Sequence, residues 1–235
     1  MAFEAVLEDI EKRGGADEIW CLGDVIGYGP EPHKCLELLR RHSHLCVAGN
    51  HDWAAVGKVD ITDFNRDAAD ANRWASEQLS QEDRRYLEDL PLRLTRDDFT
   101  LVHGSPREPI WEYVVSSASA QVNFDHFDSP YCLVGHTHAP LVLEEDQDRA
   151  FPILRQLPPR LPLGSRRLII NPGGVGQPRD GDPRASYALY DSEAMTMYHR
   201  RVAYDIAATQ ERMAALGLPP RLAARLSHNQ QRRFP

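Results

Sequence analysis

Long hydrophobic runs are missing from this sequence of 235 residues. No stretch approaches the roughly 20 consecutive apolar residues that a helix needs to cross a bilayer. The first 13 residues contain several acids and lack the apolar core of a secretory signal. We therefore expect no membrane association and a cytoplasmic location.

Cysteine and lysine are also scarce. The four cysteines form no Cys-x-x-Cys pair and lie mostly in apolar patterns. This favours reduced core residues over disulfides or a thiolate metal site. Only three lysines are present, and the formal net charge is −8. A chain this acidic is a poor non-specific partner for nucleic acid or anionic lipid.

Helical and strand-like patterns alternate along the chain as far as His138. Apolar residues recur at helical spacing over 2–13, 31–42 and about 65–90, and short apolar runs lie between these segments. The longest helical stretch is interrupted near Ser80, where Ser80 and Asp83 form a helix N-cap signal. This alternation predicts an α/β fold with some parallel sheet. We expect one domain over 1–235, with the helical segment of about 65–90 near the mouth of the site.

After His138 the pattern changes to short strand-like runs joined by turns. The segment 151–164 contains four prolines, and we expect it to be irregular. The segment 171–184 is rich in glycine and proline and ends with two arginines, Arg179 and Arg184. Because arginine suits bidentate phosphate contacts, these two side chains are candidates for substrate binding. Surface ion pairs with Asp180 or Asp182 are the alternative.

Four strand-like runs each end in a glycine next to a potential metal ligand. Since α/β sheets bind ligands beyond the carboxyl ends of their strands, these side chains can converge on one rim. A single histidine is more often a surface or core residue, but four such endings in one chain favour a shared site. The candidate residues are Asp24, Asn50, His51, His103, His136 and His138.

The candidate ligands offer only nitrogen and oxygen atoms. This set favours Mn, Fe or Zn over Cu(I) or a structural zinc site. A carboxylate such as Asp24 can bridge two ions, and two ions can clamp a phosphoryl group and make a hydroxide available. Ser105 lacks a nucleophile-elbow motif. Gly173 to Gly176 lack the spacing of a dinucleotide fingerprint.

These endings resemble the motifs of the calcineurin-like metallophosphoesterase family, in the same order. The resembling segments are Gly23-Asp24, Gly49-Asn50-His51-Asp52, His103-Gly104, Gly135-His136-Thr137-His138 and the late loop that starts at Asn171. The late loop is similar to that of the small bacterial and archaeal phosphodiesterase branch, which is related to diadenosine tetraphosphatase. The resemblance implies a four-layer αββα sandwich and a dinuclear centre of divalent metal ions, with Mn, Fe or Zn as the metals.

The resemblance also implies individual roles. Asp24 would bridge the metals, His138 would bind the first, and Asn50, His103 and His136 would bind the second. His51 would act as general acid or charge stabiliser, oriented by Asp52. The implied activity is hydrolysis of a small phosphomonoester or phosphodiester by a metal-activated hydroxide. Oligomerisation remains open.

One family motif has no counterpart. The family opens with a strand ending in Asp-x-His that supplies two ligands of the first metal, whereas this sequence starts inside the following helix. The fold would then lack its first strand, and the first metal would bind weakly. One alternative is a preceding segment that carries the motif. Another is a family member with weak or no catalysis and a regulatory or scaffold role.

Overall fold

The computed structural model describes residues 1–146, 148 and 151–227. The helices are α1 (Ala2–Lys12), α2 (Pro32–Arg40), α3 (Asn50–Ala55), α4 (Arg66–Glu77), α5 (Gln81–Asp89), α6 (Ser117–Phe124), α7 (Ile206–Ala215) and α8 (Pro220–Ser227). The strands are β1 (Ile19–Cys21), β2 (His44–Cys46), β3 (Arg93–Arg96), β4 (Phe99–Val102), β5 (Tyr131–Leu133), β6 (Leu141–Glu144), β7 (Ile153–Gln156), β8 (Leu161–Pro162), β9 (Leu168–Asn171), β10 (Ala185–Asp191) and β11 (Thr196–Val202). The fold is α/β, as predicted.

The strands form one large sheet and two smaller ones. The large sheet has the order β3-β4-β5-β9-β6-β7, and its strands β4, β5 and β9 run parallel. The second sheet has the order β10-β11-β8, and β1 and β2 form a separate parallel pair. The carboxyl ends of β4, β5 and β9 therefore meet at one edge of the large sheet.

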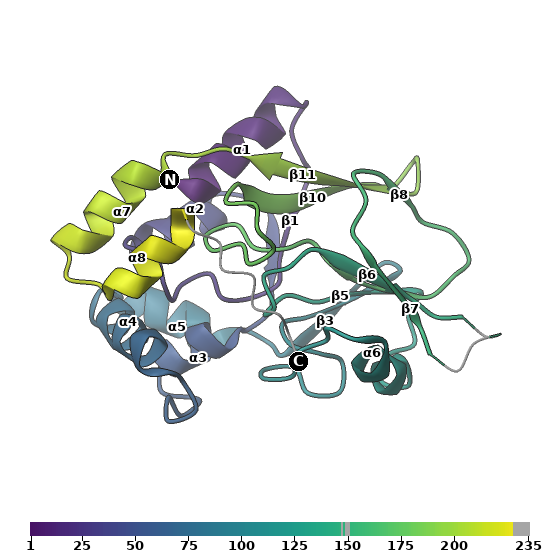
Figure 1. Cartoon of the computed structure of the whole chain (residues 1–235), viewed down its shortest axis with the longest axis horizontal. Coiled ribbons are helices and arrows are strands. Elements are labelled where there is room, and N and C mark those ends of the chain that lie inside the picture. Colours follow the sequence, from purple (N-terminus) through teal and green to yellow (C-terminus); the bar gives the residue numbers. More distant parts are fainter. Residues whose placement is uncertain (147, 149–150, 228–235) are drawn as a thin grey trace.

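The sheets and helices stack in four layers, αββα (Figure 1). Along β4, Phe99 and Leu101 pack between the sheets, while Val102 packs with Phe124 on the side of α6. This two-residue alternation follows from the pleat of a strand. On the opposite outer face, α1 lies over β10, where Val6 packs with Tyr187. The outer face of the large sheet is thus covered by α6, and the outer face of the second sheet is covered by α1.

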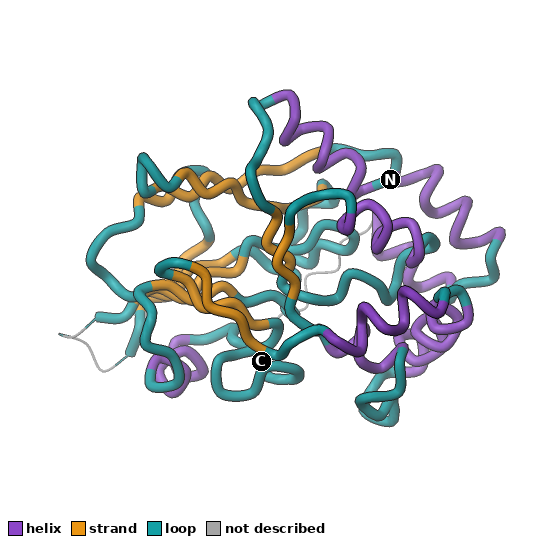
Figure 2. The backbone as a smooth tube through the Cα atoms, turned by 180° about the vertical axis from the view of Figure 1, so that it is seen from behind, coloured by secondary structure: helices purple, strands orange, loops and turns teal. Residues whose placement is uncertain are grey.

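The remaining helices gather at one end of the layers, as the tube view also shows (Figure 2). The predicted interruption of the long helical stretch is confirmed, because α4 ends at Glu77 and α5 starts at Gln81. Ser80 Oγ accepts the N–H of Asp83, and the Asp83 carboxylate accepts the N–H of Ser80. This reciprocal cap separates the two helices. None of the helices that the structure describes is both long and apolar enough to span a bilayer.

The expectation of an irregular segment over 151–164 was wrong. β7 pairs with β6, and β8 pairs with β11. Both are edge strands of their sheets, and Pro162 lies in β8. Proline is tolerated at an edge because one side of the strand needs no N–H donor. Pro162 is therefore compatible with an edge strand at this position.

The strands β1 and β10 line the same cavity, and each has one edge without a strand partner among the described residues. β1 pairs only with β2, and β10 pairs only with β11. The cavity between them has a volume of about 1260 Å³ and is lined by Trp20, Leu22 and Leu189. It extends to Asp24 and His138.

Candidate metal centre

Four side chains meet beyond the carboxyl ends of β1, β2, β4 and β5. Asp24 follows β1, Asn50 opens α3 just after β2, His103 follows β4, and His136 follows β5. Asn50, His103 and His136 are buried, and the Asp24 side chain is 13% exposed. The short loops after parallel strands thus bring together residues that are up to 112 positions apart (136 − 24) in the sequence.

The ring nitrogen Nε2 of His103 lies at the centre of this group. It is 3.0 Å from Nδ1 of His136, 3.1 Å from Oδ1 of Asn50 and 3.4 Å from Oδ2 of Asp24. One ligand atom from each of Asp24, His103 and His136 lies within 4.8 Å of the others. Such spacing is compatible with ligands of one ion, since metal bonds of about 2 Å separate neighbouring ligand atoms by about 3 Å.

The hydrogen bonds of this group leave lone pairs facing one another. Nδ1 of His103 lies 2.7 Å from the carbonyl oxygen of Leu22 and must be the donor, so Nε2 carries a lone pair. The Asn50 atom facing Nε2 is a carbonyl oxygen, which also only accepts. A carboxylate oxygen of Asp24 lies on the same side. A cation satisfies all of these atoms, and the group therefore fits a metal ion.

His138 lies beside this group and outside its 4.8 Å cluster. Its Nδ1 donates to the carbonyl of Gln177 at 2.7 Å, which leaves Nε2 as a potential ligand atom. Burial, and then the positive charge of Arg179, holds the pKa of His138 well below its usual value. His138 is therefore a neutral imidazole, and it lines the same cavity as Asp24.

Burial dominates the electrostatics of the group. It lowers the pKa of His103 and, together with the neighbouring His103, lowers that of His136 to about 2. It also raises the pKa of Asp24 to about 7, an effect that the N–H of His51 and the charge of Arg179 oppose. Metal binding requires neutral imidazoles, so the histidines are already in the ligand form.

The backbone at these positions is left-handed. Asp24, His136 and His138 have φ angles of +54°, +57° and +58°. Each such residue costs on the order of 1–3 kcal/mol, and clusters of them are typical of functional sites. The turns also approach each other closely, because a Cβ atom on Gly49 would lie 2.1 Å from Oδ1 of Asp24. Only glycine fits at that position.

Asp52 stabilises these turns. Its Oδ2 accepts the N–H groups of Asp24 at 2.7 Å and Gly49 at 3.0 Å, and its Oδ1 accepts that of Ile26 at 3.3 Å. This differs from the expected role of orienting His51. Successive helical side chains diverge, and Asp52 caps the helix and the neighbouring turn instead of reaching the ring before it.

His51 is held from several sides. Its N–H donates to Oδ1 of Asp24 at 2.9 Å, and its carbonyl accepts the amide of Asn72 at 2.8 Å. The ring lies between Tyr28 and Phe64, with centroid distances of 4.4 and 4.7 Å. Its Nδ1 has no hydrogen-bond partner among the described residues. Burial, and then the nearby His103, lowers the pKa of His51 to about 3.

The two candidate arginines differ in position. The backbone N–H of Arg179 donates to the carbonyl of His138 at 3.0 Å, and its guanidinium lies 5.8 Å from the Tyr28 ring centroid. Arg184 forms a half-exposed ion pair with Asp182 at 2.6 Å and, in the hydrogen bonds of the described chain, touches no candidate ligand. This pair lowers the pKa of Asp182 to about 2. Only Arg179 is at the site.

Sequence reasoning missed several residues that support the site. Tyr28 and Phe64 flank His51, Asn72 binds its carbonyl, and Asn171 donates to the carbonyl of Gly135 at 2.6 Å. The glycines on both sides of Tyr28, close behind Gly23-Asp24, were a signal that this loop approaches the site. No local pattern marked Asn72.

Comparison with known proteins agrees with this geometry. The pattern of the calcineurin-like phosphoesterase superfamily domain matches residues 1–195. The chain is 36% identical over 231 residues to an uncharacterized protein of Methanocaldococcus jannaschii. This alignment covers 96% of this chain and 91% of that protein. It is 32% identical over 76 residues to a symmetrical bis(5'-nucleosyl)-tetraphosphatase of Pseudomonas putida. That alignment covers 29% of this chain and 26% of that enzyme.

Solved structures share the fold. The crystal structure of a metallophosphoesterase from Sphaerobacter thermophilus is 48% identical in sequence and has a TM-score of 0.86, over 97% of this chain and 93% of the other. A hypothetical protein from Pyrococcus horikoshii OT3 has a TM-score of 0.79 at 20% identity, over 98% of this chain and 94% of the other. The sequence, the fold and the family match lead to one assignment: the chain belongs to the calcineurin-like phosphoesterase superfamily.

Proposed function

We propose that this protein hydrolyses small phosphoesters, with divalent metal ions held by Asp24, Asn50, His103 and His136. The observation that carries the proposal is the convergence of nitrogen and oxygen ligand atoms around Nε2 of His103. This set of nitrogen and oxygen donors favours Mn, Fe or Zn. His138 would contribute to a further ion.

Metal ions at such a site polarise a phosphoryl oxygen and lower the pKa of water. The residues of the chain would perform the other tasks. His51, a buried neutral imidazole beside Asp24, would donate a hydrogen bond from its ring N–H to the leaving oxygen and stabilise the charge that develops there. Arg179 would bind a phosphate oxygen, and Asp52 would maintain the turn that carries Asp24.

The test combines metal analysis with model substrates. The purified chain is loaded with Mn²⁺, its metal content is measured by mass spectrometry, and hydrolysis of bis(p-nitrophenyl) phosphate and p-nitrophenyl phosphate is followed. His103→Asn should lower metal affinity by more than about ten-fold, since even residues behind the ligands contribute ten- to a hundred-fold. His42→Asn, at an exposed histidine, is the matched control. A chain that binds no metal would overturn the proposal.

A metal-binding scaffold without turnover is the second candidate function. Within the part of the chain that the structure describes, one group of histidine and acidic residues brings three ligand atoms together, Asp24 with His103 and His136. A single ion polarises an oxygen but does not clamp both the attacking and the leaving oxygen. Stoichiometric metal with no hydrolysis of either substrate would favour the scaffold.

A further inference from the structure

The exposed ring of Tyr113 borders the metal centre on the side of the loop between β4 and α6. The ring of Tyr113 stacks on His136, with centroids 4.1 Å apart and an angle of 28° between the rings. Tyr113 is 40% exposed. A flat, half-open aromatic surface thus lies directly against a candidate metal ligand.

Further rings continue this surface around His51. Trp111, from the same loop, contacts Phe64 with a centroid distance of 5.6 Å, and Phe64 contacts His51 at 4.7 Å. Tyr28 contacts His51 from another side at 4.4 Å. We call Tyr28, Phe64, Trp111 and Tyr113 the aromatic rim. Its four rings come from three separate loops, and Tyr28, Phe64 and Trp111 are half-buried.

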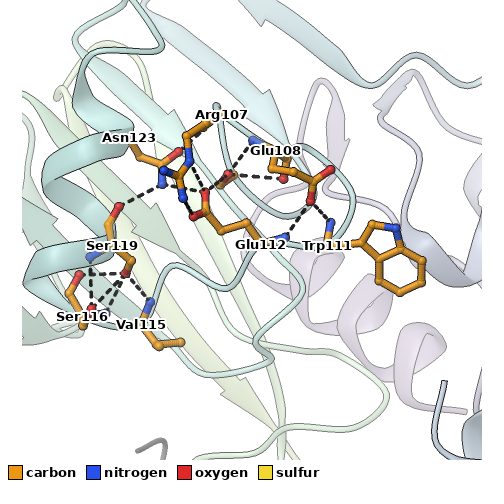
Figure 3. Close-up of polar contacts among 9 residues, drawn as sticks. Arg107, Glu108, Trp111, Glu112, Val115, Ser116, Ser119 and Asn123 are labelled. Carbon is orange, nitrogen blue, oxygen red and sulfur yellow. Dashed lines mark hydrogen bonds and ion pairs between the residues drawn. The ribbon is translucent and has the colours of Figure 1, made fainter. Parts of the chain in front are cut away.

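The loop that carries Trp111 and Tyr113 is fixed by the residue between them. Glu112 accepts hydrogen bonds from Ser105 at 2.6 Å and from Asn123 at 2.9 Å, and it pairs with Arg107 (Figure 3). The Glu108 carboxylate accepts the N–H groups of Trp111 and Glu112. In Figure 3 the Trp111 ring points away from this network. The rings are therefore presented on a rigid support, which lowers the entropy cost of binding.

We propose that the aromatic rim binds a planar ring of the substrate, so that the preferred phosphoesters carry a nucleobase or another aromatic group close to the phosphate. This inference rests on the proposed function for the position of the phosphate. Stacking on aromatic side chains tolerates different bases, because every base offers a flat face. Tyr113 is the exposed ring of the rim, and it lies against the candidate ligand His136.

The test compares ligands that differ only in the ring. Binding to the Mn²⁺-loaded protein is measured by calorimetry for adenosine 5'-monophosphate against ribose 5-phosphate, and for phenyl phosphate against cyclohexyl phosphate. We expect the planar member of at least one pair to bind about ten-fold more tightly, the size expected for one stacked ring. A preference in the first pair alone indicates a nucleobase, and a preference in the second indicates aryl groups in general.

Variants assign the preference to the rim. Tyr113→Leu should reduce the planar preference several-fold, Tyr113→Trp should restore it, and the affinity for ribose 5-phosphate and the metal content should stay unchanged. Phe151→Leu, at a 57% exposed phenylalanine remote in sequence from the site loops, is the control. Equal binding within both pairs, no binding of any of the four, or an equal loss for ribose 5-phosphate in Tyr113→Leu would overturn the proposal. Ring-selective binding without hydrolysis of any ester would refute the proposed function alone.

Discussion

Replacement of Asp52 by alanine tests how the metal centre is held. Asp52 is fully buried, and its two carboxylate oxygens accept three backbone N–H groups, from Asp24, Gly49 and Ile26. The Asp52→Ala variant removes the carboxylate that accepts these hydrogen bonds and leaves the three backbone N–H groups buried without an acceptor. The turn at Asp24, which has a φ of +54°, then loses its main restraint.

The magnitude follows from these three contacts. A buried donor without an acceptor costs about 1–3 kcal/mol. Two of the contacts, at 2.7 and 3.0 Å, are strong, and the third, at 3.3 Å, is weak. We expect the free energy of unfolding to fall by about 3–5 kcal/mol. Asp52→Asn keeps one oxygen for the two strong contacts and should lose only about 1–2 kcal/mol. Because Asp24 then relaxes, metal affinity should fall by about ten- to a hundred-fold in Asp52→Ala.

The assay has two independent readouts. Urea unfolding in the presence of a chelator at pH 8 gives the free energy of unfolding without metal, and calorimetry with Mn²⁺ gives the affinity. Asp63→Ala, at an exposed acidic residue of the loop before α4, is the control. If Asp52→Ala matched this control in both readouts, the restraint of the Asp24 turn by Asp52 would be refuted. If only turnover fell, Asp52 would act through His51, as the sequence had suggested.

Three further predictions concern the same site. His51→Ala should keep the bound metal, because Asn50 is the ligand from that loop. Turnover should fall by about 10²- to 10³-fold, as for loss of a hydrogen-bond donor to developing charge. Loss of metal in metal analysis would make His51 a ligand. Arg179→Ala should raise KM several-fold, whereas Arg184→Ala should leave the kinetics unchanged, because Arg184 is paired with Asp182 away from the ligands. Equal effects of the two substitutions in steady-state kinetics would contradict this difference between the arginines. An N-terminal extension that adds a strand between β1 and β10 and ends in Asp-x-His should raise the metal content per chain, measured by mass spectrometry. That strand would pair with the open edges of β1 and β10 and would reach Asp24 and His138. An unchanged metal content would show that the cavity does not accept such a strand.

Local patterns were sufficient for much of the fold. The reciprocal cap at Ser80 and Asp83 lies within four residues, so the break between α4 and α5 was predictable. The alternation of Phe99 and Leu101 with Val102 is also local. In contrast, β7 depends on its pairing with β6, and β8 depends on β11, more than 30 residues away. Nothing within 151–164 itself indicates these pairings.

The site was predictable to the extent that it lies at strand ends. Asp24, His103 and His136 each follow an apolar run, and parallel strands direct their carboxyl ends to one edge. The aromatic rim follows no such rule. Phe64 and Tyr113 approach the histidines from loops whose paths are set by tertiary packing, and a contact between rings on two loops leaves no periodic signal in the sequence.

The left-handed residues connect stability with function. A strained residue persists only where its surroundings restrain it, and each one here has a separate restraint. Asp52 accepts the N–H of Asp24. Asn171 donates to the carbonyl of Gly135 and to the Thr137 hydroxyl on either side of His136. His138 is held by the carbonyl of Gln177 and the N–H of Arg179. These restraints come from polar side chains and backbone groups on neighbouring loops, so the fold itself maintains the positions of the ligand atoms, and variants of the restraining residues should weaken metal binding without removing any ligand.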